Sequence, residues 1–153
     1  MLDTGEMSPL RTSGLTWTDG SGQAYDQEAF RYFLALERSR SARSNRPFLL
    51  LLVGIRRRTD RSIRRRRIDP ALAGRLFSAL WLCIRETDFI GWYREERLAG
   101  AVLTQRADGS EAGKPRQARE RVIRAMAERL PKDVVDRLHV RVCRVSSYMK
   151  ARS

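Results

Sequence analysis

The chain has 153 residues, one domain's worth, and its 42% hydrophobic content is enough for a buried core, which excludes a globally disordered protein. Lysine and arginine number 31 against 18 acidic residues, a formal charge of +13, so the surface should attract nucleotides, nucleic acid, acidic lipid or an acidic partner. No apolar run is long enough to cross a bilayer and the polar N-terminus shows no signal peptide, so the sequence predicts a cytoplasmic protein without a membrane span.

The N-terminal half predicts a flexible segment followed by a helix and a central strand. Residues 1–24 are rich in Gly, Ser, Thr and Asp and predict a flexible N-terminal segment. Trp17 is the large apolar side chain of this segment, and we expect it to pack back onto the domain. Residues 25–42 have a rough apolar face of helical period. The continuous apolar run Phe48–Ile55 predicts a strand covered on both faces.

The next region predicts a second helix and a hairpin. Residues 56–67 are rich in arginine, with no apolar period, and predict a solvated loop. Asp69 and Pro70 are typical of an N-cap and a first helical position, and the helix after them has an apolar face. Residues 89–93 and 98–104 then predict two strands joined by a tight polar turn.

A third amphipathic helix is predicted at residues 116–130, and the alternating residues 138–145 predict a last strand. This order of elements predicts an α/β sandwich in which helices flank a mixed central sheet, with the folded domain at residues 25–148. Cys83 and Cys143 have no Cys or His at metal spacing, so we expect no metal site there. His139 is the only histidine, which leaves a nucleophilic triad without support.

The residues before and within the hairpin form a recognisable pattern. Arg85-Glu-Thr-Asp88 is followed by five residues and then by the turn Arg94–Leu98. In this spacing, and in the order of its elements, the chain resembles the GGDEF domain of diguanylate cyclases, which carries an inhibitory Arg-x-x-Asp site five residues before its GGDEF turn. Asp19, Tyr25 and Phe30 also match the pattern with which that family begins.

The resemblance implies a GGDEF or nucleotidyl cyclase-like fold, and the departures from it imply lost catalysis. A cyclase needs Mg²⁺ on oxygen ligands to hold two GTP molecules. The first-strand metal position falls on Val53 or Gly54, and residues 56–67 replace the guanine-reading residues. We therefore expect no cyclase activity and no Mg²⁺. The turn positions of the family are occupied here by Arg94, Glu95, Glu96, Arg97 and Leu98.

The Arg-x-x-Asp pair is the most intact part of the family's sites. The resemblance implies that Arg85 and Asp88 bind cyclic di-GMP, with a second arginine from the following helix, either Arg116, which is closer in sequence, or Arg119. A guanidinium can donate two parallel hydrogen bonds to guanine O6 and N7, and a carboxylate can accept from N1–H and N2–H. The alternative is a surface ion pair at a helix end.

The expected function is that of a catalytically inactive GGDEF-like receptor for cyclic di-GMP, which relays the signal to a protein partner in exopolysaccharide production, motility or biofilm control. Two copies could be cross-linked by an intercalated ligand dimer, so a ligand-dependent homodimer is expected. Two alternatives remain open. The domain could be a ligand-independent interaction module, or it could be a basic nucleic-acid-binding domain that uses residues 56–67.

Overall fold

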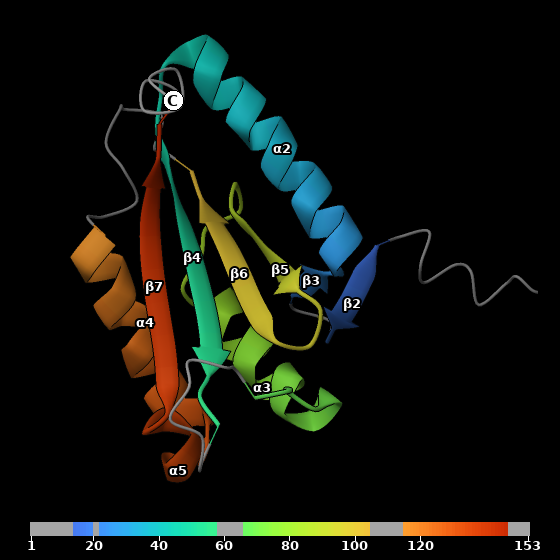
Figure 1. Cartoon of the computed structure of the whole chain (residues 1–153), viewed down its shortest axis with the longest axis vertical. Coiled ribbons are helices and arrows are strands. Elements are labelled where there is room, and N and C mark those ends of the chain that lie inside the picture. Colours follow the sequence, from blue (N-terminus) through green and yellow to red (C-terminus); the bar gives the residue numbers. More distant parts are fainter. Residues whose placement is uncertain (1–13, 20–21, 58–65, 105–114, 147–153) are drawn as a thin grey trace, which may run out of the picture.

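The computed structural model describes residues 14–19, 22–57, 66–104 and 115–146. Its strands form a six-stranded sheet in the order β2-β3-β5-β6-β4-β7 (Figure 1). β3 and β5 are parallel, and the other neighbouring strands are antiparallel. The predicted mixed sheet with flanking helices is therefore confirmed. The elements are β2 (Leu15–Thr18), β3 (Gln23–Tyr25), α2 (Gln27–Ser44), β4 (Phe48–Ile55), α3 (Pro70–Trp81), β5 (Phe89–Arg94), β6 (Leu98–Leu103), α4 (Pro115–Arg129), α5 (Lys132–Val135) and β7 (Leu138–Val145).

Local sequence signals explain where the helices begin and end. The Asp69 side chain accepts a hydrogen bond of 2.9 Å from the Leu72 N–H, which confirms the predicted N-cap of α3. Asp26 caps α2 in the same way, through the Ala29 N–H. At the other end of α2, Asn45 adopts the left-handed conformation that commonly terminates a helix.

The predicted flexible segment extends too far along the chain. Residues 15–18 and 23–24, which that prediction placed before the domain, belong to β2 and β3 at one edge of the sheet. Trp17 packs against the core, with its ring centroid 6.2 Å from that of Phe77. A strand of four residues among glycines has little local signal, so it is the packing of Trp17 and the pairing with β3 that stabilise it. Residues 1–13 and 20–21 lie outside the described part of the chain.

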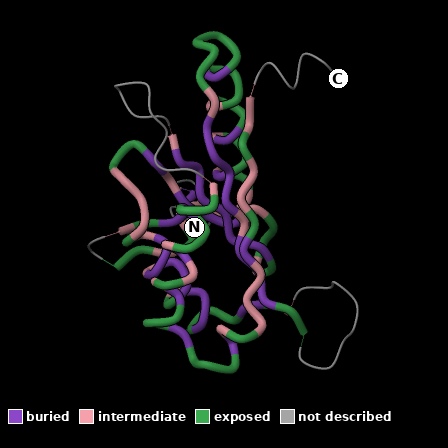
Figure 2. The backbone as a smooth tube through the Cα atoms, turned by 90° about the vertical axis from the view of Figure 1, so that its left-hand side faces the viewer, coloured by how far each residue is buried: buried purple, intermediate pink, exposed green. Residues whose placement is uncertain are grey.

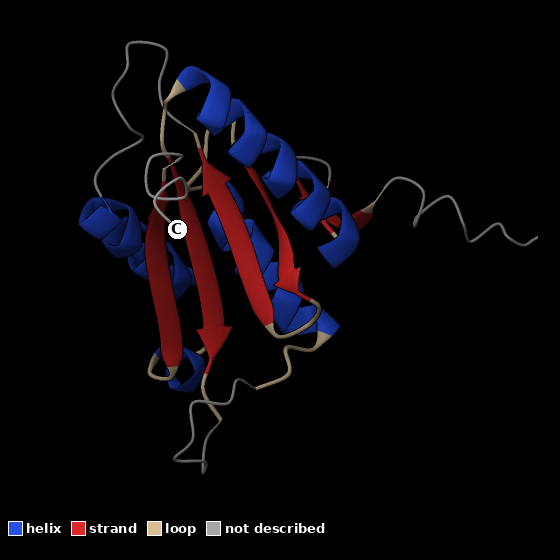
Figure 3. Cartoon of the chain, turned by 45° about the horizontal axis from the view of Figure 1, so that its top comes forward, coloured by secondary structure: helices blue, strands red, loops and turns tan. Residues whose placement is uncertain are grey.

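β4 lies inside the sheet and is covered on both faces, as its apolar run predicts. Successive strand residues point to opposite faces. Leu49, Leu51, Val53 and Ile55 therefore join the larger core cluster beneath α3 and α4, while Phe48 and Leu50 join a second cluster with α2. Figures 1 and 3 show α2 on one side of the sheet and the other helices behind it, and Figure 2 shows the buried trace between them.

Two strand glycines allow the elements on the α2 side to come close. A Cβ at Gly91 would lie 2.5 Å from the Tyr25 carbonyl oxygen of β3. A Cβ at Gly100 would lie 2.8 Å from Cζ of Phe30, a fully buried residue of α2. The absence of side chains at these two positions is what lets β3 pair with β5 and lets the ring of Phe30 pack closely against the sheet.

Among the described residues, no helix combines the length and the apolar character needed to span a bilayer. Cys83 and Cys143 are both free and half-buried. Burial raises the pKa of the Cys83 thiol, so this group is protonated and weakly nucleophilic near neutral pH.

We expect Gly91→Val to destabilise the fold by about 1–3 kcal/mol, because the new side chain must displace the backbone of β3. Urea unfolding followed by tryptophan fluorescence measures this loss. Gly74→Ala in α3 is the matched control. Its Cβ would meet nothing closer than 3.7 Å, and alanine favours a helix by up to about 1 kcal/mol over glycine. Equal stability of the two variants would contradict the close approach of β3.

Candidate functional site

Asp88 lies at the junction between the end of α3 and the start of β5, with its carboxylate turned inward. Its side chain is 1% exposed. Oδ2 accepts a hydrogen bond of 2.9 Å from the Arg85 N–H, and Oδ1 accepts from the Thr104 N–H at 2.9 Å and from Thr104 Oγ1 at 3.1 Å. The carboxylate therefore ties the loop after α3 to the end of β6, and its oxygens are not accessible to a ligand in this conformation.

Arg85 is held by the same junction but reaches the surface. Its Nη2 donates to the Thr104 carbonyl, and its Nε lies 3.8 Å from Oδ2 of Asp88. Nε is buried without a hydrogen-bond partner, whereas the side chain as a whole is 32% exposed. The structure thus brings Arg85 and Asp88 together, with the arginine facing outward and the carboxylate serving as its support.

The two predicted second arginines lie on α4 in different settings. Arg119 Nε donates to the Val140 carbonyl of β7 at 3.0 Å. Val140 pairs with Val53 of β4, whereas Leu103, next to the Thr104 that anchors Arg85, pairs with Leu49. Four residues of strand separate these two levels by about 13 Å, so Arg119 is anchored away from Arg85. Arg116 is exposed in the first turn of α4.

The hairpin turn at residues 94–97 is closed by a hydrogen bond of 3.0 Å from the Arg97 N–H to the Arg94 carbonyl, which confirms the predicted tight turn. Glu96 has a φ of 60°, in the left-handed region that favours glycine. Its carbonyl accepts from the Ile68 N–H at 2.7 Å. The turn is therefore fastened to the segment that leads into α3.

Both carboxylates of this turn are engaged within the chain. Glu95 Oε1 accepts from the Gln27 N–H at 3.2 Å, and Gln27 Oε1 accepts from the Glu95 N–H at 2.6 Å. Glu96 Oε1 binds Arg67 Nε at 2.7 Å. Burial raises the pKa of Glu95, whereas the hydrogen bond from Arg67 lowers the pKa of Glu96. Each carboxylate thus stabilises a neighbouring element, one the start of α2 and the other the approach to α3.

The strand positions beside the turn offer no metal ligand. Val53 is fully buried between Ala99 and Val140, and Gly54 lies opposite His139. In the described ranges, no three His, Cys, Asp or Glu side chains gather where they could hold an ion. Residues 58–65 of the predicted arginine-rich loop lie outside those ranges.

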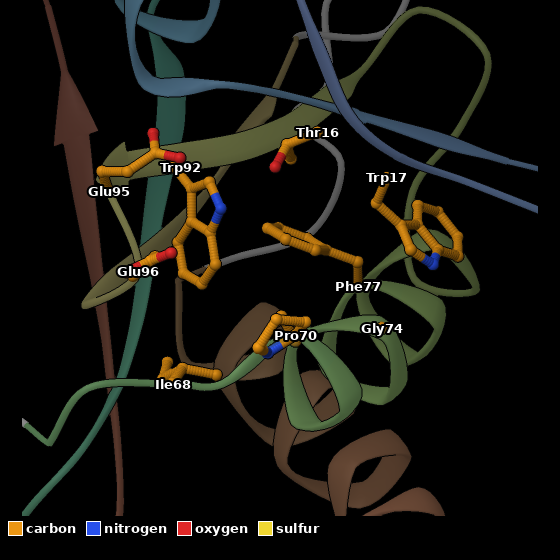
Figure 4. Close-up of a pocket in the computed structure, with 10 residues that line it drawn as sticks. Thr16, Trp17, Ile68, Pro70, Gly74, Phe77, Trp92, Glu95 and Glu96 are labelled. Atoms are coloured by element: carbon orange, nitrogen blue, oxygen red, sulfur yellow. The ribbon is translucent and has the colours of Figure 1, made fainter.

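A cavity of about 190 Å³ lies between β2, the first turns of α3 and the hairpin turn. Figure 4 shows the rings of Trp17, Phe77 and Trp92 around it, with Glu95 and Glu96 at one side. Trp92 is buried and meets Phe77 edge to face at 4.9 Å. Sequence reasoning missed this cavity, because its walls come from three segments that lie far apart in the sequence. The expectation that Trp17 packs back onto the domain is confirmed.

Comparisons with known proteins find similarity in structure alone. No protein-family model matches the sequence, and no curated protein matches it. Among solved structures, a DGC protein from Thermotoga maritima is 14% identical, with a TM-score of 0.54 over 84% of this chain and 85% of that one.

Two further solved structures agree with this similarity. The FimX GGDEF domain from Pseudomonas aeruginosa is 12% identical, with a TM-score of 0.52 over 86% of this chain and 82% of that one. The third is the coiled coil and GGDEF domain of DgcB from Caulobacter crescentus, solved in complex with c-di-GMP. It is 9% identical, with a TM-score of 0.54 over 95% of this chain and 79% of that one. The chain therefore has the fold of the GGDEF domain.

Proposed function

We propose that this domain is a non-catalytic receptor for cyclic di-GMP, in which Arg85 contacts the ligand and Asp88 holds Arg85 in place. The observation that carries the proposal is the Arg85–Asp88–Thr104 junction in a chain with the GGDEF fold. It presents one partly exposed guanidinium on a support that is already formed. The DgcB structure of the same fold was solved with c-di-GMP, which supports this class of ligand.

The chemistry of Arg85 suits a guanine base. A guanidinium has five N–H donors in a fixed fork, and the bond to the Thr104 carbonyl uses one of them. Two parallel N–H groups match guanine O6 and N7, whereas adenine has an N–H₂ donor in place of O6. Leu82, which is 61% exposed and lies three residues before Arg85, offers an apolar surface against which a base can pack. In this arrangement the arginine provides specificity for guanine, and no direct role is needed for the Asp88 carboxylate.

Two features support the absence of catalysis. Guanylyl transfer to form cyclic di-GMP needs a metal that neutralises the phosphates. At the positions where the resemblance would place the metal ligands, Val53 is a buried apolar residue and Glu96 is paired with Arg67. A metal ion would have to displace Arg67 from Glu96 and would then find no second carboxylate on β4.

We propose further that ligand binding is relayed to a protein partner or to a second copy of the chain. Cyclic di-GMP has two equivalent guanine faces, so an intercalated ligand dimer can join two Arg85 sites. The exposed side chain of Leu82, three residues before Arg85, can give such a contact an apolar component. Signalling in polysaccharide secretion, motility or biofilm control is the class of process that this role would serve.

Calorimetric titration tests the ligand and the residue together. We expect cyclic di-GMP to bind the wild type, and we expect Arg85→Ala and Arg85→Lys to lose at least about tenfold in affinity, because neither can present the two parallel N–H groups. Cyclic di-AMP should bind much more weakly, which separates guanine recognition from the general attraction of a chain with a formal charge of +13.

Arg124→Ala is the matched control. It also removes one arginine, here an exposed one on α4, and it should leave the affinity unchanged. Thermal unfolding of each variant confirms that it is folded. Absence of heat with the wild type would overturn the proposed receptor function and would favour a ligand-independent interaction module. In that case the inward-facing Asp88 would have a purely structural role. Unchanged affinity in both Arg85 variants would overturn the site.

We expect Asp88→Ala to lower the free energy of unfolding by about 1–3 kcal/mol, because it leaves the part-buried N–H groups of Arg85 and Thr104 without their acceptor. Urea unfolding measures the change. Glu86→Ala, an exposed neighbour, is the control and should stay within about 0.5 kcal/mol of the wild type. A loss no larger than that of the control would show that the junction does not depend on Asp88.

Incubation with GTP and Mg²⁺ should yield no cyclic di-GMP, as measured by chromatography of the reaction mixture, because neither Val53 nor the paired Glu96 can hold the metal. A GGDEF domain that has both metal-binding carboxylates serves as the positive control. Detectable product from this chain, absent in Glu96→Gln, would overturn the non-catalytic assignment.

A further inference from the structure

Three arginines line a hollow at the end of β4, away from the Arg85 junction. Its volume is about 410 Å³, and its lining residues are Arg57, Arg66, Asp133 and Arg137. Arg57 follows β4, Arg66 lies on the approach to α3, and the other two belong to α5 and the turn after it. The proposed receptor function uses none of these residues.

Backbone hydrogen bonds hold Arg66, Arg137 and Arg56, the residue before Arg57, at the same strand end. The Arg66 N–H donates to the Ile55 carbonyl at 2.6 Å, and the Arg56 N–H donates to the Arg137 carbonyl at 2.9 Å. Ile55 in turn pairs with Leu138, the first residue of β7. The convergence is therefore part of the sheet framework, and it does not depend on flexible side chains meeting by chance.

The charges around the hollow are unbalanced. Among the described residues that line the hollow, three guanidiniums accompany one carboxylate, a formal net charge of +2 for these four side chains. Asp133 is already paired with Arg137, whose Nη2 lies 3.1 Å from Oδ2 and whose Nε donates to the Asp133 carbonyl at 3.1 Å. Within the described ranges, the guanidinium of Arg66 has no hydrogen-bond or ion-pair partner. Like charges gathered in this way repel one another, and a bound anion would offset that repulsion.

We propose that this hollow binds a phosphate dianion, either inorganic phosphate or the terminal phosphate of a small phosphomonoester. Arginine's planar fork matches the oxygens of a phosphate group in a bidentate arrangement. A phosphomonoester carries about −1.5 to −2 at neutral pH, which balances the local +2. The side chain of Arg137 is only 17% exposed, and partial burial strengthens its attraction to an anion relative to a fully solvated arginine.

The phosphodiesters of cyclic di-GMP carry one negative charge each, so this site and the Arg85 junction differ in the ligand that each prefers. The hollow is also larger than a phosphate group alone, which leaves room for a small organic substituent. Its ligand preference is therefore set by the charge of the phosphate, and an esterified phosphate and the free ion share the chemistry that the arginines recognise.

Calorimetric titration with inorganic phosphate, glycerol 3-phosphate and dimethyl phosphate at constant ionic strength tests the proposal. We expect both dianions to bind the wild type and the diester monoanion to bind at least about tenfold more weakly. Arg66→Gln should weaken binding of the dianions by about tenfold, because it removes a charge-assisted pair. Arg124→Gln, which removes one exposed arginine from α4, should change the affinity less than twofold.

Asp133→Asn provides a test of opposite sign. It removes the carboxylate found among the described lining residues, so we expect binding of inorganic phosphate to become severalfold tighter. Equal binding of dimethyl phosphate and inorganic phosphate would overturn the site, as would equal losses of phosphate affinity in Arg66→Gln and Arg124→Gln. Weaker phosphate binding by Asp133→Asn would overturn the argument from local charge. Arg85→Ala should leave phosphate binding intact, so failure of this site and failure of the cyclic di-GMP site remain distinguishable.

Discussion

The burial of β4 on both faces is the constraint on which the other elements depend. A strand of eight apolar residues cannot leave either face in water, so each face needs its own cover. α3 and α4 cover one face and α2 covers part of the other. The second cover is possible only because Gly91 and Gly100 leave room for β3 and for the ring of Phe30. The sheet order follows, with β6 and β7 on either side of β4.

The surroundings of the end of β4 carry the residues on which the proposed lack of catalysis rests. Val53 points into the core, and the two hairpin carboxylates stabilise the start of α2 and the approach to α3. Arginines dominate the surroundings of the same sheet end, and three of them share the hollow with Asp133. Hard-metal chemistry needs clustered oxygen ligands, whereas the guanidiniums of this hollow have the chemistry that the proposed phosphate site requires.

The Arg85–Asp88 pair shows why a short motif does not determine a role. The same four residues could form an exposed ion pair, a two-sided ligand clamp or a structural junction. Here the Asp88 carboxylate satisfies backbone donors from two segments, so removing it from water costs little. Arg85, anchored at one end, keeps part of its guanidinium at the surface. The two residues have different roles because of Thr104, sixteen residues beyond Asp88, which donates to the Asp88 carboxylate and accepts from Arg85.

The sequence by itself determined the elements with strong local signals: the apolar strand at residues 48–55, the capped helix that starts at Asp69–Pro70, the hairpin and the mixed sheet, together with the closeness of Arg85 and Asp88. It did not indicate β2, which has four residues and forms through Trp17 and β3, nor the four-residue helix α5. It also could not show that Arg119 bonds to β7 or that Arg57, Arg66 and Arg137 converge. Apolar periodicity and helix caps depend on residues that are close in the sequence, so they can be recognised before the fold is known. The direction of a long charged side chain depends on carbonyl groups and charges that only folding brings within reach.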